Sequence, residues 1–356
     1  MAFVLALAGR RHMNKPLCVL TMGDPSGIGP EIILKALFSR RTIEAADMVV
    51  AGYPEPFERD AAMLNMDISM NLIHSSRNLS RKPDTVNLIV PDKKAAIPLA
   101  YGIHDPRCGA AAAYCIELAA NLALAGEAGA VVTAPISKES LNTAGYRFPG
   151  HTEFLQRLTG AGDIAMLLTL DRFRVVHVVT HAAIREVPNM VKNDRIVRVS
   201  SLLHDALRLI GIQQPGIAVS GLNPHAGEAG MFGREEIEEI VPAVEELRAN
   251  GMRIAGPFPP DTIFARGYCG EFDGIVAMYH DQGHIALKLA GFRFGGERRE
   301  VGGVNTTLGL PIIRTSVDHG TAFDIAGKAV ASELSMIEAV EMASKMAEGR
   351  ARQGNA

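Results

Sequence analysis

The sequence predicts an α/β protein with mostly parallel strands, and three observations support this. Short apolar, β-branched segments alternate with amphipathic segments along almost all of the 356 residues, which is typical of α/β folds. No internal repeat and no long Pro/Gly/Ser linker divides the chain. With 47% hydrophobic and 21% charged residues, the composition excludes a disordered, collagen-like or coiled-coil chain. We therefore expect two lobes that share a cleft rather than two independent domains.

Each expected element follows from its local pattern: strands are short apolar runs, and helices carry apolar residues at a spacing of three to four. The expected strands are Leu17–Met22, Met48–Gly52, Asn87–Val90, Ala130–Ala134, Ala165–Leu170, Arg174–Thr180, Ile217–Gly221, Gly274–Tyr279 and Ile312–Thr315. The expected helices are Pro30–Arg41, Cys108–Ala125, Val191–Ile210, Glu235–Asn250 and Ser332–Arg350. The first of these helices begins at a proline, which is favoured in the first helical position.

Charge and apolar content exclude several classes of partner. The 36 Lys and Arg residues against 39 Asp and Glu residues give a net charge of -3. Because the chain has no long block of residues with one sign of charge, nothing indicates a surface that binds nucleic acid. No segment approaches the roughly 18–20 uncharged apolar residues of a membrane span, so we expect no membrane partner.

The N-terminus and the cysteines indicate the compartment. Ala2–Ala8 is short for a secretory apolar region, and Arg10 and Arg11 follow it rather than precede it. Residues 1–13 are therefore expected to form a disordered extension. The four cysteines are far apart, which predicts reduced thiols in a cytoplasmic protein; they are Cys18, Cys108, Cys115 and Cys269.

Three histidines follow separate predicted strands at their carboxyl ends: His181, His225 and His280. Ligands of open α/β sheets bind at this edge, so the three imidazoles are candidates for a catalytic divalent metal site. A single histidine at a strand end is more often a hydrogen-bonded turn residue, so spacing alone leaves both interpretations open. His177 is expected either in the core or behind the metal ligands, and His284 either binds the metal or only lies near it.

Signals for anionic ligands are present but ambiguous. The first strand ends in T-M-G-D-P-S-G-I-G-P-E, which lacks the third glycine of a dinucleotide fingerprint and the G-K-[ST] of a P-loop. It is either a tight turn or a cofactor loop. Thr152 is a candidate helix N-cap beside an anion site. Lys288 and Arg314 are candidate phosphate or carboxylate ligands, with surface ion pairs as the alternative.

A series of motifs in chain order resembles the 4-hydroxythreonine-4-phosphate dehydrogenase family of pyridoxal phosphate biosynthesis. The motifs are G-D-P-S-G-I-G-P-E, T-A-P-I-S-K-E, P-G-H-T-E, G-L-N-P-H-A-G-E, P-P-D-T, A-M-Y-H-D-Q-G-H, G-V-N-T-T-L-G-L-P and I-R-T-S-V-D-H-G-T-A-F-D-I-A-G. The resemblance implies a bilobal isocitrate/isopropylmalate dehydrogenase-like fold, with two α/β/α lobes and an active-site cleft between them. Lobe 1, on the cofactor side, would contain residues 14–135 and 306–356. Lobe 2, with the metal, substrate and dimer contacts, would contain residues 136–305.

The resemblance also implies roles for individual residues. The implied metal ligands are His181, His225 and His280, in a site shared between the two subunits of a homodimer. The implied substrate ligands are His151, Thr152, Lys288, Asn305 and Arg314. The implied cofactor contacts are His319, Gly320 and Asp324, and the catalytic candidates are Asp281 and Lys288. NAD or NADP is the expected cofactor; Zn²⁺ is the first expectation for the metal, with Mg²⁺ or Co²⁺ as alternatives.

The implied reaction is oxidation of the C3 hydroxyl of a 4-phosphorylated four-carbon hydroxy acid, followed by decarboxylation. The substrate is expected to be 4-phosphooxy-L-threonine or 4-phospho-D-threonate/D-erythronate, and H-D-Q-G-H-I and T-A-F-D-I-A-G resemble the second branch more. The segment Arg293–Gly303 departs from the family pattern and is expected to reshape or cover the pocket. The alternatives are a metal-dependent hydrolase or lyase without nicotinamide, and a non-catalytic binding protein with structural histidines.

Overall fold

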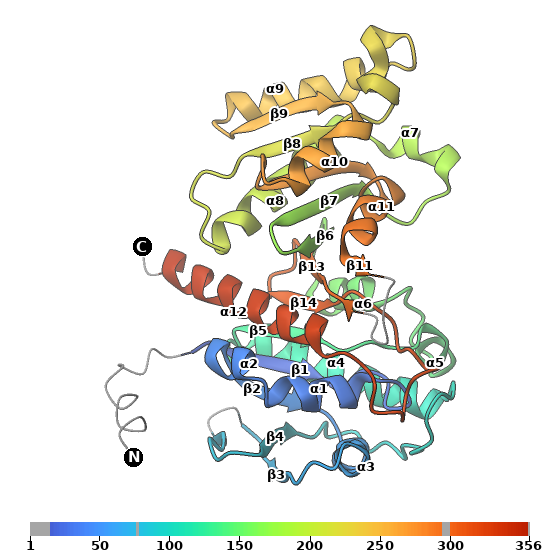
Figure 1. Cartoon of the computed structure of the whole chain (residues 1–356), viewed down its shortest axis with the longest axis vertical. Coiled ribbons are helices and arrows are strands. Elements are labelled where there is room, and N and C mark those ends of the chain that lie inside the picture. The colour runs from blue at the N-terminus through green and yellow to red at the C-terminus, as the bar shows by residue number, and fades with distance from the viewer. Residues whose placement is uncertain (1–14, 76–77, 294–299, 355–356) are drawn as a thin grey trace.

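The computed structural model describes residues 15–75, 78–293 and 300–354. Its described strands form a 12-stranded sheet in the order β3-β4-β2-β1-β5-β14-β13-β6-β7-β10-β8-β9, with a separate pair β11-β12 (Figure 1). The predicted α/β class is confirmed. The extension predicted at residues 1–13 lies outside the described residues.

The strands and helices have the following bounds. The strands are β1 (Leu17–Thr21), β2 (Asp47–Ala51), β3 (Ser69–Leu72), β4 (Thr85–Ile89), β5 (Ala130–Thr133), β6 (Ala165–Leu170), β7 (Phe173–Val179), β8 (Ile217–Ser220), β9 (Ile254–Phe258), β10 (Gly274–Tyr279), β11 (Phe292–Arg293), β12 (Glu300–Val301), β13 (Val304–Leu308) and β14 (Arg314–Val317). The α-helices are α1 (Gly29–Leu37), α2 (Arg40–Ala45), α3 (Pro54–Met63), α4 (Pro106–Leu124), α5 (Lys138–Thr143), α6 (His151–Thr159), α7 (Val187–Met190), α8 (Asn193–Leu209), α9 (Val241–Ala249), α10 (Pro260–Tyr268), α11 (His280–Gly291) and α12 (Leu334–Gly354). No described helix is long and apolar enough to cross a membrane.

The sheet is parallel at both ends and antiparallel at its centre. β13 runs antiparallel to both β14 and β6, and β6 runs antiparallel to β7. Only Asp171 and Arg172 connect β6 to β7, and Asp171 has φ +52°. Two residues form a hairpin, whereas a parallel pair needs a long crossover. The antiparallel centre joins the two halves of the sheet (Figure 1).

Several expected elements differ in detail from those observed. The expected helix Pro30–Arg41 is two helices, because Ser39 is extended (φ -71°, ψ 134°) between α1 and α2. The expected helix Glu235–Asn250 begins with a π-helical turn, Glu236–Ile240, before α9. The last expected strand lies two residues further on, as β14. The segment Arg293–Gly303 contributes to the antiparallel pair β11-β12.

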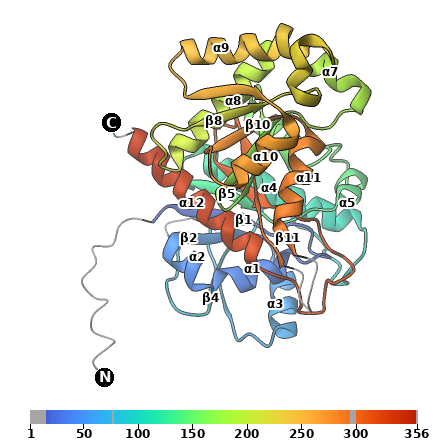
Figure 2. The same cartoon turned by 45° about the horizontal axis from the view of Figure 1, so that its top comes forward.

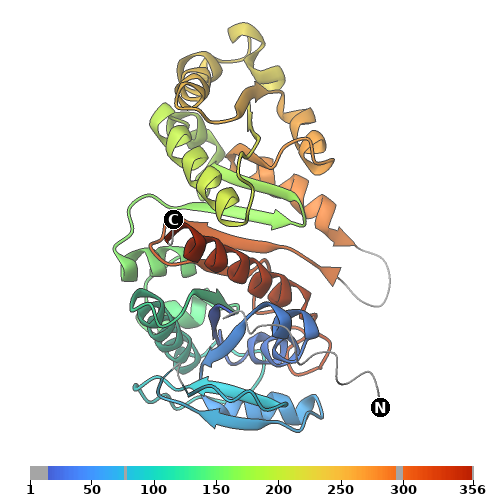
Figure 3. The same cartoon turned by 90° about the vertical axis from the view of Figure 1, so that its left-hand side faces the viewer.

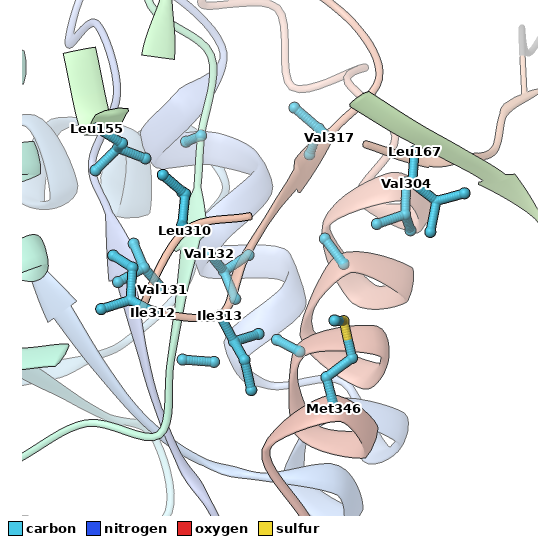
Figure 4. Close-up of a cluster of buried hydrophobic side chains, with 14 of the residues drawn as sticks. Val131, Val132, Leu155, Leu167, Val304, Leu310, Ile312, Ile313, Val317 and Met346 are labelled. Atoms are coloured by element: carbon cyan, nitrogen blue, oxygen red, sulfur yellow. The ribbon is translucent and has the colours of Figure 1, made fainter. Parts of the chain in front are cut away.

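Helix α12 crosses the middle of the molecule and covers the strands that carry the site (Figure 3). Its Met346 belongs to the buried cluster that includes Val131 of β5 and Ile313 before β14 (Figure 4). The hydroxyl of Thr315 in β14 donates a 2.8 Å hydrogen bond to the carbonyl of Ala339 in α12. Burial of each large aliphatic side chain stabilises the fold by about 1.5–3 kcal/mol. This packing of α12 fixes the position of β14, the strand that carries Arg314.

Candidate active site

A cavity of about 350 Å³ lies beyond the carboxyl ends of β5 and β14 and against the first turn of α6. It brings together many of the predicted site residues: His151, Thr152, His181, Asn305, Arg314, His319 and Gly320. Sequence reasoning missed further lining residues, among them Lys138, Glu153, Ser316 and Asp318. Ser316 and Asp318 follow Arg314 at the two-residue period of a strand, and this was the signal that could have identified them.

Arg314 is the charged group at the base of this cavity. Its side chain is buried, and the guanidinium donates hydrogen bonds to the hydroxyls of Thr133 (2.6 and 3.2 Å) and Thr307 (2.9 Å). Among the described residues it forms no salt bridge. Burial lowers the pKa of Arg314 to about 9, which still leaves it cationic at neutral pH. The charge of Glu153, which lines the same cavity, raises the pKa of Arg314 but forms no salt bridge with it. A buried cation without an ion-pair partner is unfavourable, so the site favours an anionic ligand.

The first turn of α6 is a second feature suited to an anion. The N-cap is Gly150, without a side-chain cap, and α6 begins at His151. The expected N-cap, Thr152, is therefore wrong by two positions, because the extended backbone of Gly150 starts the helix earlier. Unbonded N–H groups at a helix start favour negative charge, and these residues line the cavity.

Buried polar atoms without partners point to the same cavity. His151 Nε2, Asn305 Oδ1 and His319 Nε2 have no hydrogen-bond partner in the described structure. Burial, followed by the charge of Arg314, holds the pKa of His151 well below its ordinary 6.5. His151 is therefore neutral at pH 7, and one of its ring nitrogens can donate to a ligand while the other accepts.

Lys288 is held by Asp318. The Lys288 ammonium on α11 forms an ion pair with the carboxylate of Asp318 and a 3.2 Å hydrogen bond to its backbone carbonyl. The ion pair anticipated as the alternative for Lys288 is thus present, but it is partly buried. Asp318 itself lines the cavity, so this pair connects the cavity to α11.

His181 and His280 lie near each other, with ring centroids 5.9 Å apart. His280 Nδ1 lies 2.7 Å from the Asp281 carboxylate, which leaves Nε2 available as a ligand atom. His284 stacks on His280 at 3.7 Å, and burial lowers the pKa of His284 to about 4. His177 is fully buried beneath them, as expected, and burial lowers its pKa to about 3.

His225 lies elsewhere in the single chain. It follows β8 in the turn Pro224–Gly230, and its ring contacts Phe232 at a centroid distance of 6.3 Å. In the part of the chain that the structure describes, no group of three or more His, Cys, Asp or Glu side chains is arranged to hold a metal ion. The paired imidazoles of His181 and His280 are chemically suited to be two ligands of a divalent metal, whereas the described part of the single chain does not group His225 with them.

The glycine-rich loop after β1 packs against the segment expected to contact the cofactor. Ile28 donates a 3.1 Å hydrogen bond to the carbonyl of Thr321, and a Cβ on Gly27 would lie 2.8 Å from the same oxygen. His319 and Gly320 line the cavity, whereas Asp324 is exposed and lies outside its lining. The absence of a side chain at Gly27 lets the loop pack directly on the backbone of Thr321. His319, whose Nε2 has no partner in the described structure, lines the cavity beside this contact.

A cation-lined cavity beyond the strand ends of an α/β sheet defines a class of enzymes that bind small anionic substrates. The family model described as pyridoxal phosphate biosynthetic protein PdxA matches residues 44–343, and the chain belongs to this family. The family expectation is therefore confirmed.

Relatives in the family are named dehydrogenases. The chain is 46% identical to a putative D-threonate 4-phosphate dehydrogenase of Bradyrhizobium diazoefficiens, over 93% of this chain and 96% of the relative. It is 43% identical to a 4-hydroxythreonine-4-phosphate dehydrogenase of Desulfosudis oleivorans, over 92% of this chain and 95% of the relative. The crystal structure of 4-hydroxythreonine-4-phosphate dehydrogenase from Klebsiella pneumoniae matches with a TM-score of 0.81 and 43% sequence identity. The match covers 93% of this chain and 99% of that structure. The expected fold and the expected dehydrogenase class are confirmed.

Proposed function

We propose that the protein oxidises the C3 hydroxyl of a 4-phosphorylated four-carbon hydroxy acid with NAD or NADP, and that decarboxylation follows. The observation that carries this proposal is the buried guanidinium of Arg314, which lines the cavity and forms no salt bridge with any described residue. Two relatives named for 4-phosphorylated four-carbon substrates support the substrate class. The division into lobes at residues 135/136 and 305/306 remains part of this proposal.

The chain's own residues would hold the substrate by its charged ends. Arg314 is oriented by Thr133 and Thr307 and would bind one anionic group with charge-assisted hydrogen bonds. The first turn of α6, with Thr152, would bind another. His151 and Asn305, whose buried polar atoms lack partners, would complete the polar lining. Lys288 would bind the substrate from α11 or donate a proton to it, with Asp318 fixing its position.

The implied metal would be held by His181 and His280 of one chain and His225 of a second copy. When bound, a divalent ion lowers the pKa of an alcohol ligand and polarises a ketone. Asp281 would fix the ring of His280 through its Nδ1 hydrogen bond and is the candidate for proton transfer. His319, Gly320 and Asp324 would hold the nicotinamide cofactor, which accepts the hydride.

We further propose 4-phospho-D-threonate as the physiological substrate. The motifs H-D-Q-G-H-I and T-A-F-D-I-A-G favour this branch, and relatives at 46% and 44% identity carry the D-threonate name. The experiment is an assay of NAD⁺ and NADP⁺ reduction with Zn²⁺, Mg²⁺ or Co²⁺ across 4-phosphorylated C4 acids. We expect the highest kcat/KM with 4-phospho-D-threonate, and comparable values on all substrates would contradict this assignment.

The same assay separates the alternative function. A metal-dependent hydrolase or lyase would consume substrate without nicotinamide and form no reduced cofactor. We expect product only when NAD⁺ or NADP⁺ is present. Turnover of the phosphorylated acids without cofactor would overturn the dehydrogenase proposal.

A homodimer is the expected assembly, and exposed apolar side chains support it. They lie on or beside the elements that carry the three histidines: Ile184, Met190, Met231, Phe232, Ile285 and Leu289. We call this set the apolar patch. Helices α7 and α11 lie on the same side of the molecule in both views (Figures 1 and 2). A second copy that covers the patch would remove this surface from water and bring its histidines near the site.

A further inference from the structure

The turn after β8 has an unusual backbone. From His225 to Gly230 every residue has a positive φ angle: +54°, +54°, +80°, +43°, +55° and +94°. Left-handed backbone is disfavoured for residues other than glycine, because Cβ approaches the following carbonyl oxygen. Four of these residues carry a Cβ. Such a run persists only when its surroundings hold it in place, and strained backbone is concentrated at functional sites.

The carboxylate of Glu236 anchors the chain at the start of this turn. Its Oε1 accepts hydrogen bonds from the backbone N–H groups of Leu222 (2.8 Å) and Asn223 (2.7 Å). Its Oε2 accepts a 2.9 Å hydrogen bond from the side-chain amide of Asn223. Glu236 is only 3% exposed, and among the described ion pairs none neutralises it. A buried carboxylate is costly unless its acceptor sites are used, and here the turn uses them.

The turn also packs directly on this carboxylate. A Cβ built on Gly227 would lie 2.7 Å from Glu236 Oε2, and one on Gly221 would lie 2.9 Å from the Cα of Ala226. Both distances are too short for a side chain. The two glycines therefore let the left-handed turn approach Glu236 and β8, and Gly227 provides a second way to disturb the same contact.

Glu236 is the first residue of the π-helical turn Glu236–Ile240. Such turns are rare and occur frequently at functional sites. The π-helical turn and the left-handed turn thus meet at one buried side chain. His225 is the first residue of the left-handed run. Because Glu236 holds the backbone of this turn, it also sets the position of the His225 side chain.

We propose that Glu236 is a positioning residue that holds the left-handed turn Pro224–Gly230 and thereby presents His225 as a metal ligand. This inference rests on the proposed function, in which His225 contributes to the metal site. Glu236 itself touches neither substrate nor metal in this proposal. Loss of a side chain that orients a ligand typically weakens metal binding about 10- to 100-fold.

The test is Co²⁺ binding to the full-length protein, followed by its visible absorption, which reports coordination geometry without an activity assay. The variant Glu236→Gln keeps the side-chain size but replaces one acceptor oxygen by a donor amide. We expect its Co²⁺ affinity to fall about 10- to 100-fold, with an altered absorption band and faster hydrogen exchange at Leu222 and Asn223. Glu238→Gln is the matched control, because Glu238 is exposed and forms a surface ion pair with Arg234. The Co²⁺ affinity of this variant should equal that of the wild type.

Unchanged Co²⁺ affinity in folded Glu236→Gln protein overturns the inference. If that variant does not fold, Gly227→Ala disturbs the same contact, and unchanged affinity there has the same meaning. His225→Ala separates the two proposals. If it binds Co²⁺ like the wild type, the metal role of His225 in the proposed function fails, and the positioning role fails with it. If it loses Co²⁺ while Glu236→Gln does not, only the positioning role fails.

Discussion

Among single residues, Arg314 is the strongest candidate to bind an anionic substrate, because its buried guanidinium is bonded only to hydroxyl groups in the described structure and forms no salt bridge there. Loss of a charge-assisted hydrogen bond costs about 1.5–3 kcal/mol. We therefore expect Arg314→Ala to raise the substrate KM at least about tenfold, measured by steady-state NAD(P)⁺ reduction.

Arg266→Ala is the control for this measurement. Arg266 is a surface residue paired with Glu271, so its KM should not change. A wild-type KM in a folded Arg314→Ala protein would remove Arg314 from the substrate site.

His177 predicts a pH dependence of stability. Its folded-state pKa is lowered to about 3 from the ordinary 6.5, chiefly by burial. Between these values the unfolded chain binds more protons, so the free energy of unfolding falls as pH falls from about 6.5 towards 3. We expect His177→Leu to flatten this slope in denaturation experiments at pH 7, 6 and 5, in metal-free protein.

The slope should not vanish, because burial also lowers the pKa of His284 to about 4. His74→Leu, at an exposed histidine, is the control and should keep the wild-type slope. An equal slope in His177→Leu would show that this side chain does not titrate on unfolding in the predicted window.

At the scale of secondary structure, apolar runs predicted most of the parallel strands and also β6 and β7, whereas β3, β9 and β13 were missed. β13 reads V-N-T-T-L and was missed because its threonines are buried by bonding rather than by hydrophobicity: Thr307 accepts from Arg314. The antiparallel centre also could not be derived from periodicity, because pairing direction depends on the two-residue turn at Asp171.

The candidate site could be predicted only in part, because sequence periodicity locates strand ends but not contacts between residues of different elements. His181 and His280, just beyond the carboxyl ends of β7 and β10, could be placed from the pattern. Arg314 was expected near the end of a strand but is the first residue of β14, so only the motif identified it.

Asp318 had a signal in its two-residue spacing from Arg314, although its ion pair with Lys288 had none. Glu236 had no signal, because its importance comes from its contacts with the turn at His225. Such contacts depend on tertiary packing, which local sequence does not encode.

The crossing of α12 over α8 depends on a glycine. A Cβ on Gly349 would overlap the backbone carbonyl of Leu209 at the end of α8. Since neither backbone can move without disturbing the core, we expect Gly349→Ala to lower the free energy of unfolding by about 1–3 kcal/mol, measured by urea denaturation. Gly354→Ala, at the open end of the same helix, should have almost no effect. Equal stabilities of the two variants would mean that the crossing tolerates a methyl group.

At the scale of the whole molecule, a net charge of -3 does not oppose binding of anionic ligands, because the cations that meet them are local. One continuous sheet carries both the cavity and the histidines, through the antiparallel strands β13 and β6. The substrate site and the elements that carry the apolar patch are therefore connected by secondary structure rather than by a flexible linker.

If the metal site is shared between two copies at the apolar patch, activity requires the dimer. Leu289 on α11 is 83% exposed, next to Lys288. We expect Leu289→Glu to place a charge in the dimer contact, shift the protein from dimer to monomer in sedimentation velocity, and lower kcat/KM together with Co²⁺ affinity. Raising the protein concentration should restore both, as mass action requires. Val330→Glu is the control, since Val330 is 63% exposed and lies outside the patch. A Leu289→Glu monomer with wild-type metal affinity would show that each chain completes its own site, and it would overturn the shared arrangement of the three histidines.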